Sequence, residues 1–226
     1  MNGIAGLLML ADSRLPAGGH AHSGGVEAAV SVGAVRTVDD LAVFLRGRLR
    51  TAGAVAAGLA AAACADLGGC ERLDAEADAR MPSPAQREAS RQQGRALLRA
   101  ARVAWPAPVL EALAATPGGP HHAVVLGVAA AATGADPGGA AQVAAYLSVS
   151  GPAAAAVRLC AFDPLAVNGI LAALADEVVA VAETGTVAAL AGGVEAGFGG
   201  LPAAAAPRLD VLAEVHARTE VRLFAS

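Results

Sequence analysis

The sequence predicts an all-α fold, a single-domain helical bundle of about eight helices over residues 1–226. Of the 226 residues, 62 are alanine and only 3% are aromatic. Alanine is the strongest helix former and a poor strand former. Apolar residues recur at helical spacing in several segments, whereas none alternates apolar and polar residues as a strand would. The length is nearer one large domain than two.

The clearest helix is expected over residues 38–66, where apolar residues recur every three or four positions. Thr37 can cap its first turn, and Asp39 and Asp40 lie where the helix dipole favours acids. The pair Gly68-Gly69 should end it, because glycine is the commonest residue just beyond a helix C-terminus.

A polar N-cap followed by proline marks three later helix starts, which are Ser83-Pro84, Asp136-Pro137 and Asp163-Pro164. Glutamine at position 86 completes a capping-box pattern at the first of them. The segments that follow are expected to be helical to Trp105, about Val149 and about Glu183, respectively.

Two regions depart from this helical pattern. Residues 12–27 form a loop-rich N-terminal motif, in which glycine, proline, serine and histidine cluster before a short helix. Residues 192–207 are a stretch of glycine, alanine and proline that we expect to be mobile. Beyond it, the tail at 208–226 keeps an apolar face.

Composition excludes several function classes. All 16 basic residues are arginine, and without lysine there is no Walker A phosphate loop, lysine Schiff base or Ser-Lys nucleophile. The net charge of −4 provides no field that would draw the whole molecule to nucleic acid or an anionic membrane. We therefore expect no nucleic-acid partner and no membrane partner.

Cysteine usage and the N-terminus predict a reduced, cytoplasmic protein. Cys64, Cys70 and Cys160 form no CxxC pair, and the N-terminus has no basic region or convincing cleavage site of a signal peptide. Mean hydropathy is +0.52. The longest charge-free stretches are nevertheless alanine-rich and interrupted by proline, so we expect no transmembrane helix.

Histidines are the candidate metal ligands. His20 and His22 occupy alternate positions of the loop, and His121-His122 could join them. The favoured alternative is structural, because a glycine-rich loop needs polar side chains to satisfy its own backbone.

Arginines are the candidate docking groups. Five of them share one face of the helix expected at 84–105, namely Arg87, Arg91, Arg95, Arg99 and Arg102. Only Glu88 lies on that face as a compensating acid, so the stripe is either a solvated face or a dock for carboxylates or phosphates. Nucleic acid is a weaker version of the second interpretation, because there are few aromatic residues to stack bases and the net charge is negative. Arg158 lies in an apolar helical segment, where a charge requires an acid, a helix C-terminus or another chain as partner. The internal candidates for that partner are Asp12, Glu27 and Asp176.

The string DSRLPAGGHAHSGGVE at 12–27 resembles the N-terminal signature of the UreF family of urease accessory proteins. The resemblance continues in order through residues 89–95, 121–127 and 155–159 to His216 and residues 222–226. Its structural signature residues are Asp12, Ser13, Pro16, Gly18, His22, Ser23 and Glu27. Two departures are His20, where the family usually has phenylalanine, and Gly24, where a larger residue is common.

The resemblance implies an all-helical chaperone that is not an enzyme, has no cofactor or metal of its own and forms a homodimer. It would bridge UreD (UreH in some species) to the GTPase UreG on the urease apoprotein, so that nickel is inserted into urease. The alternative is a direct nickel carrier that uses the histidine-bearing N-terminal loop.

Partner docking is expected at seven positions, Arg91, Arg95, Arg158, His216, Arg222, Leu223 and Phe224. In the tail, the resemblance suggests that the last residues order against UreD. Arg222 would pair with a carboxylate there, and Phe224 would be a buried anchor.

Overall fold

The computed structural model describes residues 3–219 and 223–224, with residues 192–196 described by their backbone alone. Every regular element in this part of the chain is helical, which confirms the all-α prediction. The α-helices are α1 (Gly3–Ala11), α2 (Val26–Ser31), α3 (Val38–Arg48), α4 (Ala54–Ala65), α5 (Cys70–Ala79), α6 (Pro84–Ala104), α7 (Pro108–Leu113), α8 (His122–Ala132), α9 (Pro137–Cys160), α10 (Pro164–Ala173), α11 (Ala175–Ala196) and α12 (Pro207–Ala217).

The described residues thus contain more helices than the eight or so expected. Helices α2 and α7 have six residues each, which is fewer than two turns. Such short helices contain too few repeats of apolar residues to be recognised from sequence periodicity. The single helix expected from residue 164 is divided at Leu174 into α10 and α11. It also extends beyond Glu183, to Ala196.

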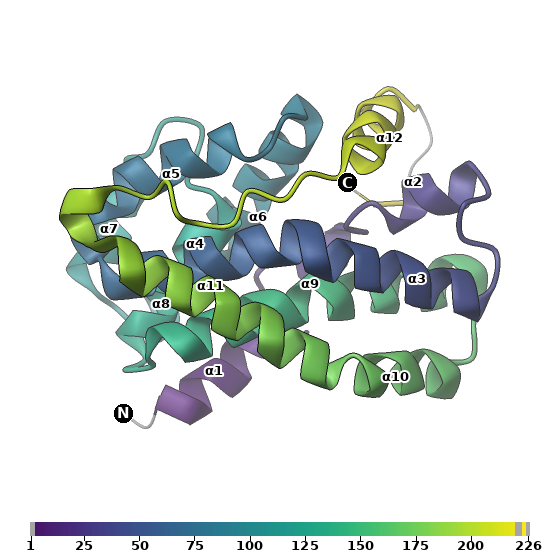
Figure 1. Cartoon of the computed structure of the whole chain (residues 1–226), viewed down its shortest axis with the longest axis horizontal. Helices are drawn as coiled ribbons and strands as arrows, with labels where there is room; N and C mark the ends of the chain where they lie inside the picture. The colour runs from purple at the N-terminus through teal and green to yellow at the C-terminus, as the bar shows by residue number, and fades with distance from the viewer. Residues whose placement is uncertain (1–2, 220–222, 225–226) are drawn as a thin grey trace.

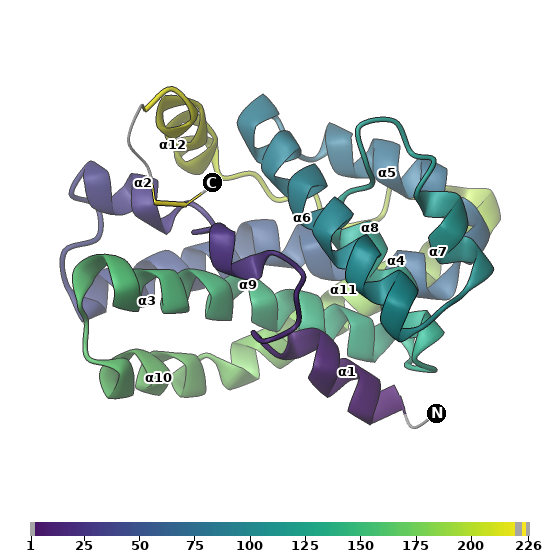
Figure 2. The same cartoon turned by 180° about the vertical axis from the view of Figure 1, so that it is seen from behind.

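Helices α4 and α9 lie at the centre of the bundle. Helix α4 packs against α8, α9 and α11, while α6 and α7 lie over α8. Figures 1 and 2 show α12 at one edge beside α2, close to the C-terminus. Helix α12 packs on α2 and α6, so the end of the chain lies beside the N-terminal motif.

The helix expected over 38–66 is confirmed as a continuous helical run. The Thr37 hydroxyl accepts a hydrogen bond from the Asp40 amide, and the Asp40 carboxylate accepts one from the Thr37 amide, which forms a capping box. A π-helical segment at Leu49–Gly53 joins α3 to α4. Three leucines at four-residue spacing, Leu41, Leu45 and Leu49, are fully buried and fix the inner face of this run.

Small residues allow the helix backbones to approach closely. A Cβ atom on Gly127 of α8 would lie 2.2 Å from the Ala60 carbonyl oxygen of α4. A Cβ atom on Gly185 of α11 would lie 2.8 Å from the Gly58 amide nitrogen of α4. Larger side chains at these crossings would push the helices apart, so the small residues are a packing requirement.

Helix α9 runs through Pro152 to Cys160, well beyond the end expected near Val149. Proline has no N–H, so it leaves the carbonyl of Ser148, four residues earlier, without its helical donor. The Arg48 side chain of α3 replaces that donor, because its Nε lies 3.0 Å from the Ser148 oxygen. Burial lowers the pKa of Arg48 to about 10, which leaves its guanidinium charged at neutral pH.

The stretch expected to be mobile lies partly outside the residues whose side chains are described. Its first part belongs to α11, and residues after Gly197 pass over α4 and α5. Leu201 is buried, and the Arg80 side chain donates hydrogen bonds to the carbonyls of Phe198 and Pro202. This segment therefore has more anchoring contacts than its composition suggests.

One helix in the described part of the chain, α9, is long and apolar enough to cross a membrane by composition alone. Two bent helix pairs would raise that number to three if each were one span. Helix α9 packs against α3, α4, α8 and α11. Its apolar composition is accounted for by its central place in the bundle.

Candidate functional site

The N-terminal motif is shaped by glycines with positive φ. Gly18, Gly24 and Gly25 have φ of 77°, 58° and 87°, a region that other residues rarely adopt. A Cβ atom on Gly24 would lie 2.7 Å from the Pro152 ring, so a larger residue would have to displace Pro152 or the loop. The glycine at this position is thus matched to the proline in α9.

The signature residues divide into surface and buried groups. Ser13 and Pro16 are exposed, and hydrogen bonds from Arg14 lower the pKa of Asp12 to about 2. His22 and Ser23 are buried. The His22 Nδ1 and the Ser23 Oγ have no hydrogen-bond partner among the residues that the structure describes.

The fold does not bring the four candidate histidine ligands together, because only the side chains of His22 and His122 are neighbours. His20 is exposed, whereas burial lowers the pKa of His22. Burial and the neighbouring His22 lower the pKa of His122 to about 4, so both side chains are neutral at pH 7. His121 points into a different polar network. Among the described residues, the N-terminal loop does not form a cluster of three metal-ligand atoms.

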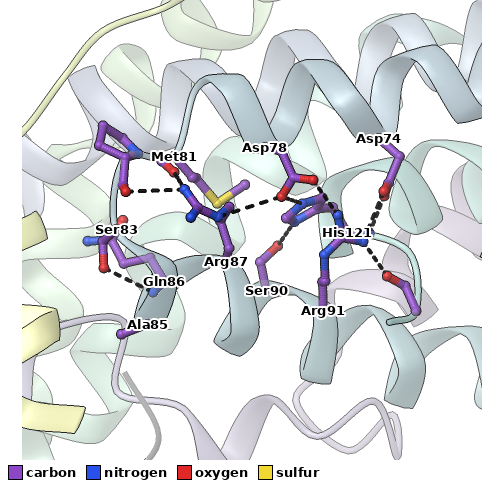
Figure 3. A network of polar contacts seen from close by, with 12 residues as sticks. Asp74, Asp78, Met81, Ser83, Ala85, Gln86, Arg87, Ser90, Arg91 and His121 are labelled. Carbon is purple, nitrogen blue, oxygen red and sulfur yellow. Dashed lines mark hydrogen bonds and ion pairs between the residues drawn. The ribbon is translucent and has the colours of Figure 1, made fainter. Parts of the chain in front are cut away.

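His121 belongs instead to a partly buried network with Asp74, Asp78, Ser90 and Arg91 (Figure 3). The Arg91 guanidinium lies 2.9 Å from Asp74 Oδ2 and 2.6 Å from Asp78 Oδ2. The His121 ring lies 2.9 Å from Asp78 Oδ1 and 3.0 Å from Ser90 Oγ. The His121 amide donates to Asp74 Oδ1 at 2.7 Å.

This network fastens α5, α6 and the start of α8 together. Burial opposes ionisation of Asp78, but the hydrogen bonds and charges of His121 and Arg91 hold its pKa below the ordinary value. Burial lowers the pKa of His121 despite the hydrogen bond that its ring donates to the Asp78 carboxylate. Asp74, Asp78 and His121 are close enough to hold a metal ion, but the Arg91 guanidinium already supplies positive charge between the carboxylates.

The arginine face of α6 is largely paired, which corrects the expectation of an uncompensated stripe. Arg91 forms ion pairs with Asp74 and Asp78 of α5. Other ion pairs join Arg95 to Glu88 and Arg102 to Glu111 of α7. Arg87 donates to the Met81 carbonyl at 2.6 Å, whereas Arg99 is exposed. The spacing of Asp74 and Asp78 by four residues, equal to that of Arg87 and Arg91, was the signal that could have identified these partners.

The C-terminal tail folds back onto Glu27 of the signature. The two carboxylate oxygens of Glu27 accept the amides of Leu223 and Phe224 at 2.8 and 2.9 Å. The His216 Nε2 lies 3.3 Å from Glu27 Oε2 and 3.2 Å from the Phe224 carbonyl oxygen. Sequence reasoning assigned Glu27 to the structural loop but missed this contact with residues almost two hundred positions away.

Phe224 is a buried anchor in the core of its own chain, whereas the resemblance suggested that it would be an anchor against UreD. Its side chain is 8% exposed and belongs to the core cluster around α9. The Arg158 guanidinium lies 4.7 Å from the centre of its ring, a cation–π contact in place of the acid proposed from sequence. Leu223 is 75% exposed, and Arg222 lies outside the described residues.

A cavity of about 890 Å³ connects these features. Its lining includes His22, Arg48, His122, Arg158, Asn168 and Asp210. The N-terminal motif, α6, α9, α10 and α12 all contribute walls, so it lies where the signature, the arginine of α9 and the last helix meet. The lining therefore combines guanidinium groups and neutral imidazoles with apolar walls.

These features define the chain as an all-helical protein whose buried polar groups hold its helices and its tail in place around a cavity. A family model described as UreF matches residues 35–175. The urease accessory protein UreF of Mycolicibacterium vanbaalenii is 45% identical over 231 residues, with 100% of both chains covered. Those of Mycobacterium marinum and Mycobacterium tuberculosis (strain H37Rv) are 42% and 40% identical, again with full coverage of both chains. The chain belongs to the UreF family of urease accessory proteins.

Proposed function

We propose that this chain is a non-enzymatic scaffold in urease maturation, which bridges UreD and the GTPase UreG on the urease apoprotein. The observation that carries the proposal is full-length identity of 40–45% to proteins described as urease accessory protein UreF. Nickel is the cargo of the assembly, and UreG would hydrolyse the GTP. We propose that the scaffold acts in the cytoplasm as a homodimer.

Two features of the surface support a docking role. The cavity opens beside the signature loop and Arg158, where a partner segment can meet guanidinium groups. Leu223 is exposed beside the buried Phe224, so the tail presents an apolar side chain from an anchored position. If UreD docks on the tail, it would contact the exposed Leu223 side chain directly. It would contact Phe224 only if the hydrogen bonds from the tail amides to Glu27 were broken.

The nickel-carrier alternative has less support from the geometry. Its loop histidines are split between an exposed position, His20, and a buried one, His22. Nickel titration of the chelator-treated protein separates the two hypotheses. Tight stoichiometric binding that is lost when His20 and His22 are both changed to alanine would favour the carrier.

Complementation tests the scaffold role. A urease operon that lacks only this gene should produce inactive urease, and this chain supplied in trans should restore activity. UreD and UreG should then co-purify with it. Restored activity without any co-purifying accessory protein would contradict bridging, and failure to restore activity with soluble chain present would contradict the role altogether.

A further inference from the structure

Helix α11 has one face in the bundle and one face outside it. Its inner face packs on α4 and α9, with Ala182 buried and Gly185 against the α4 backbone. Its outer face carries five exposed residues at helical spacing, Asp176, Val179, Glu183, Val187 and Leu190, which we call the α11 stripe. Val187 and Leu190 are 68% and 58% exposed. The stripe is therefore apolar except for two acids two turns apart.

The charges of this region are unbalanced. Residues 159–207 contain five acids and no basic residue. Glu177 is paired with Arg46 and Arg50, and Asp163 caps α10. Asp176 and Glu183 form no ion pair with any residue that the structure describes. The two acids of the α11 stripe thus remain available for positive charge from outside the chain.

A hollow lies directly beside this stripe. It has a volume of about 190 Å³ between α11 and the start of α9, and Gly138, Gln142, Ala182, Glu183, Thr186 and Val187 line it. Gly138, Ala182 and Val187 provide walls for methylene groups, while Glu183 provides a carboxylate at the same place. A lysine or arginine side chain has this combination of an apolar stem and a cationic head.

We propose that the α11 stripe is a docking surface for a helix of a partner protein that carries apolar residues and a basic side chain, which enters the hollow beside Glu183. If a second copy of the chain packed its own α11 stripe on this surface, it would place no basic side chain beside Asp176 and Glu183, because the α11 stripe contains none. An anionic membrane would meet them with charge of the same sign. The proposal rests on the scaffold function proposed above, since it identifies one of the surfaces that a maturation partner would occupy.

Affinities of the full chain for separately purified UreD, UreG and urease apoprotein test this proposal. Glu183→Arg should weaken one of the three complexes at least about tenfold at low salt, because it places like charges together. Gly138→Leu should weaken the same complex by filling the hollow without changing charge. Matched controls are Glu71→Arg on α5 and Val103→Asp on α6, both at exposed positions, which should leave that affinity unchanged.

A photo-crosslinker at position 187 identifies the contact independently. It should attach to a segment of the affected partner that is apolar and basic, whereas the same group at position 103 should not. All variants should keep wild-type circular dichroism, because the substituted positions lie outside the core. Wild-type binding by both Glu183→Arg and Gly138→Leu, with partners still bound, would overturn the stripe assignment alone. If the wild-type chain bound none of the three partners, both the scaffold function and the α11 stripe assignment would be overturned. Crosslinking only to a second copy of the chain, or only to anionic vesicles, would contradict the assignment of a partner helix to the α11 stripe.

Discussion

Helices α6 and α11 both show charge on their outer faces, but the two faces are built differently. On α6, arginines form ion pairs with acids of α5 and α7 and donate to carbonyls of the loop between α7 and α8. On α11, Asp176 and Glu183 form no ion pair with described residues, and they alternate with exposed apolar residues. We therefore expect a dense row of charge to be a weaker sign of docking than a sparse row that forms no ion pair among the described residues.

The largest expected difference between the two helices is in stability. Arg91→Ala should lower the free energy of unfolding by about 3 kcal/mol, because it leaves Asp74 and Asp78 close together without their cation. Glu183→Gln on α11 should change it by less than about 0.5 kcal/mol. Urea unfolding measures both. A small loss for Arg91→Ala would mean that the network contributes little, and would return Arg91 to the list of docking candidates.

The tail allows the same comparison between neighbouring residues. Phe224→Ala should cost about 2 kcal/mol of unfolding free energy, because the ring is buried beneath Arg158. Leu223→Ala should cost less than about 0.5 kcal/mol, because its side chain is exposed. Affinity for UreD, measured on both, would then show which residue docks. Equal stability losses would contradict the anchoring of Phe224 in the chain's own core.

Lowering the pH should lower the free energy of unfolding, because His122 in the lining of the cavity is held neutral in the folded chain. The folded-state pKa of His122 is about 4, below its ordinary value of 6.5. Between these values the unfolded chain binds a proton that the folded chain excludes, so stability should fall by about 2 kcal/mol from pH 6.5 to 4. His122→Gln should flatten this dependence in chemical unfolding at several pH values, whereas the exposed His20→Gln should not. Parallel curves for all three proteins would show that burial of His122 does not govern the loss.

A small effect on both stability and partner affinity is expected at Arg95. Arg95→Glu removes one exposed ion pair with Glu88 and should cost less than about 1 kcal/mol, with helical circular dichroism unchanged. Its affinity for UreD and UreG at low salt should also be close to that of the wild type. A salt-sensitive loss of either complex would restore the outer face of α6 as a docking surface and weaken the contrast with α11.

The helix starts could be predicted from the sequence, because they depend on residues that are neighbours along the chain. The caps at Thr37, Ser83, Asp136 and Asp163 each accept an amide of the following turn, and each begins a helix as expected. Capping acts within three residues, so a single chain shows it directly. The helix starts were therefore predictable, while the passage of α9 through Pro152 was not, because its compensating donor is Arg48 of another helix.

The site was harder to predict because its contacts join distant parts of the chain. Glu27 and Phe224 are separated by 197 positions, and Arg46 and Glu177 by 131. Only the packing of the intervening helices brings such pairs together. Asp74, Asp78 and Arg91 are closer in sequence, and their matched spacing did contain a usable signal.

The central claim is that α11 forms a docking surface, whereas the arginines of α6 are paired within the chain. Urease activity in cells tests this claim most directly. An operon lacking only this gene would be complemented with the wild-type chain, Arg95→Glu or the double variant Glu183→Arg, Val187→Asp. The wild type and Arg95→Glu should restore similar activity, and the double variant should restore little while accumulating to the same level as a folded protein. Full activity with the double variant, together with a loss for Arg95→Glu, would contradict the assignment of both surfaces.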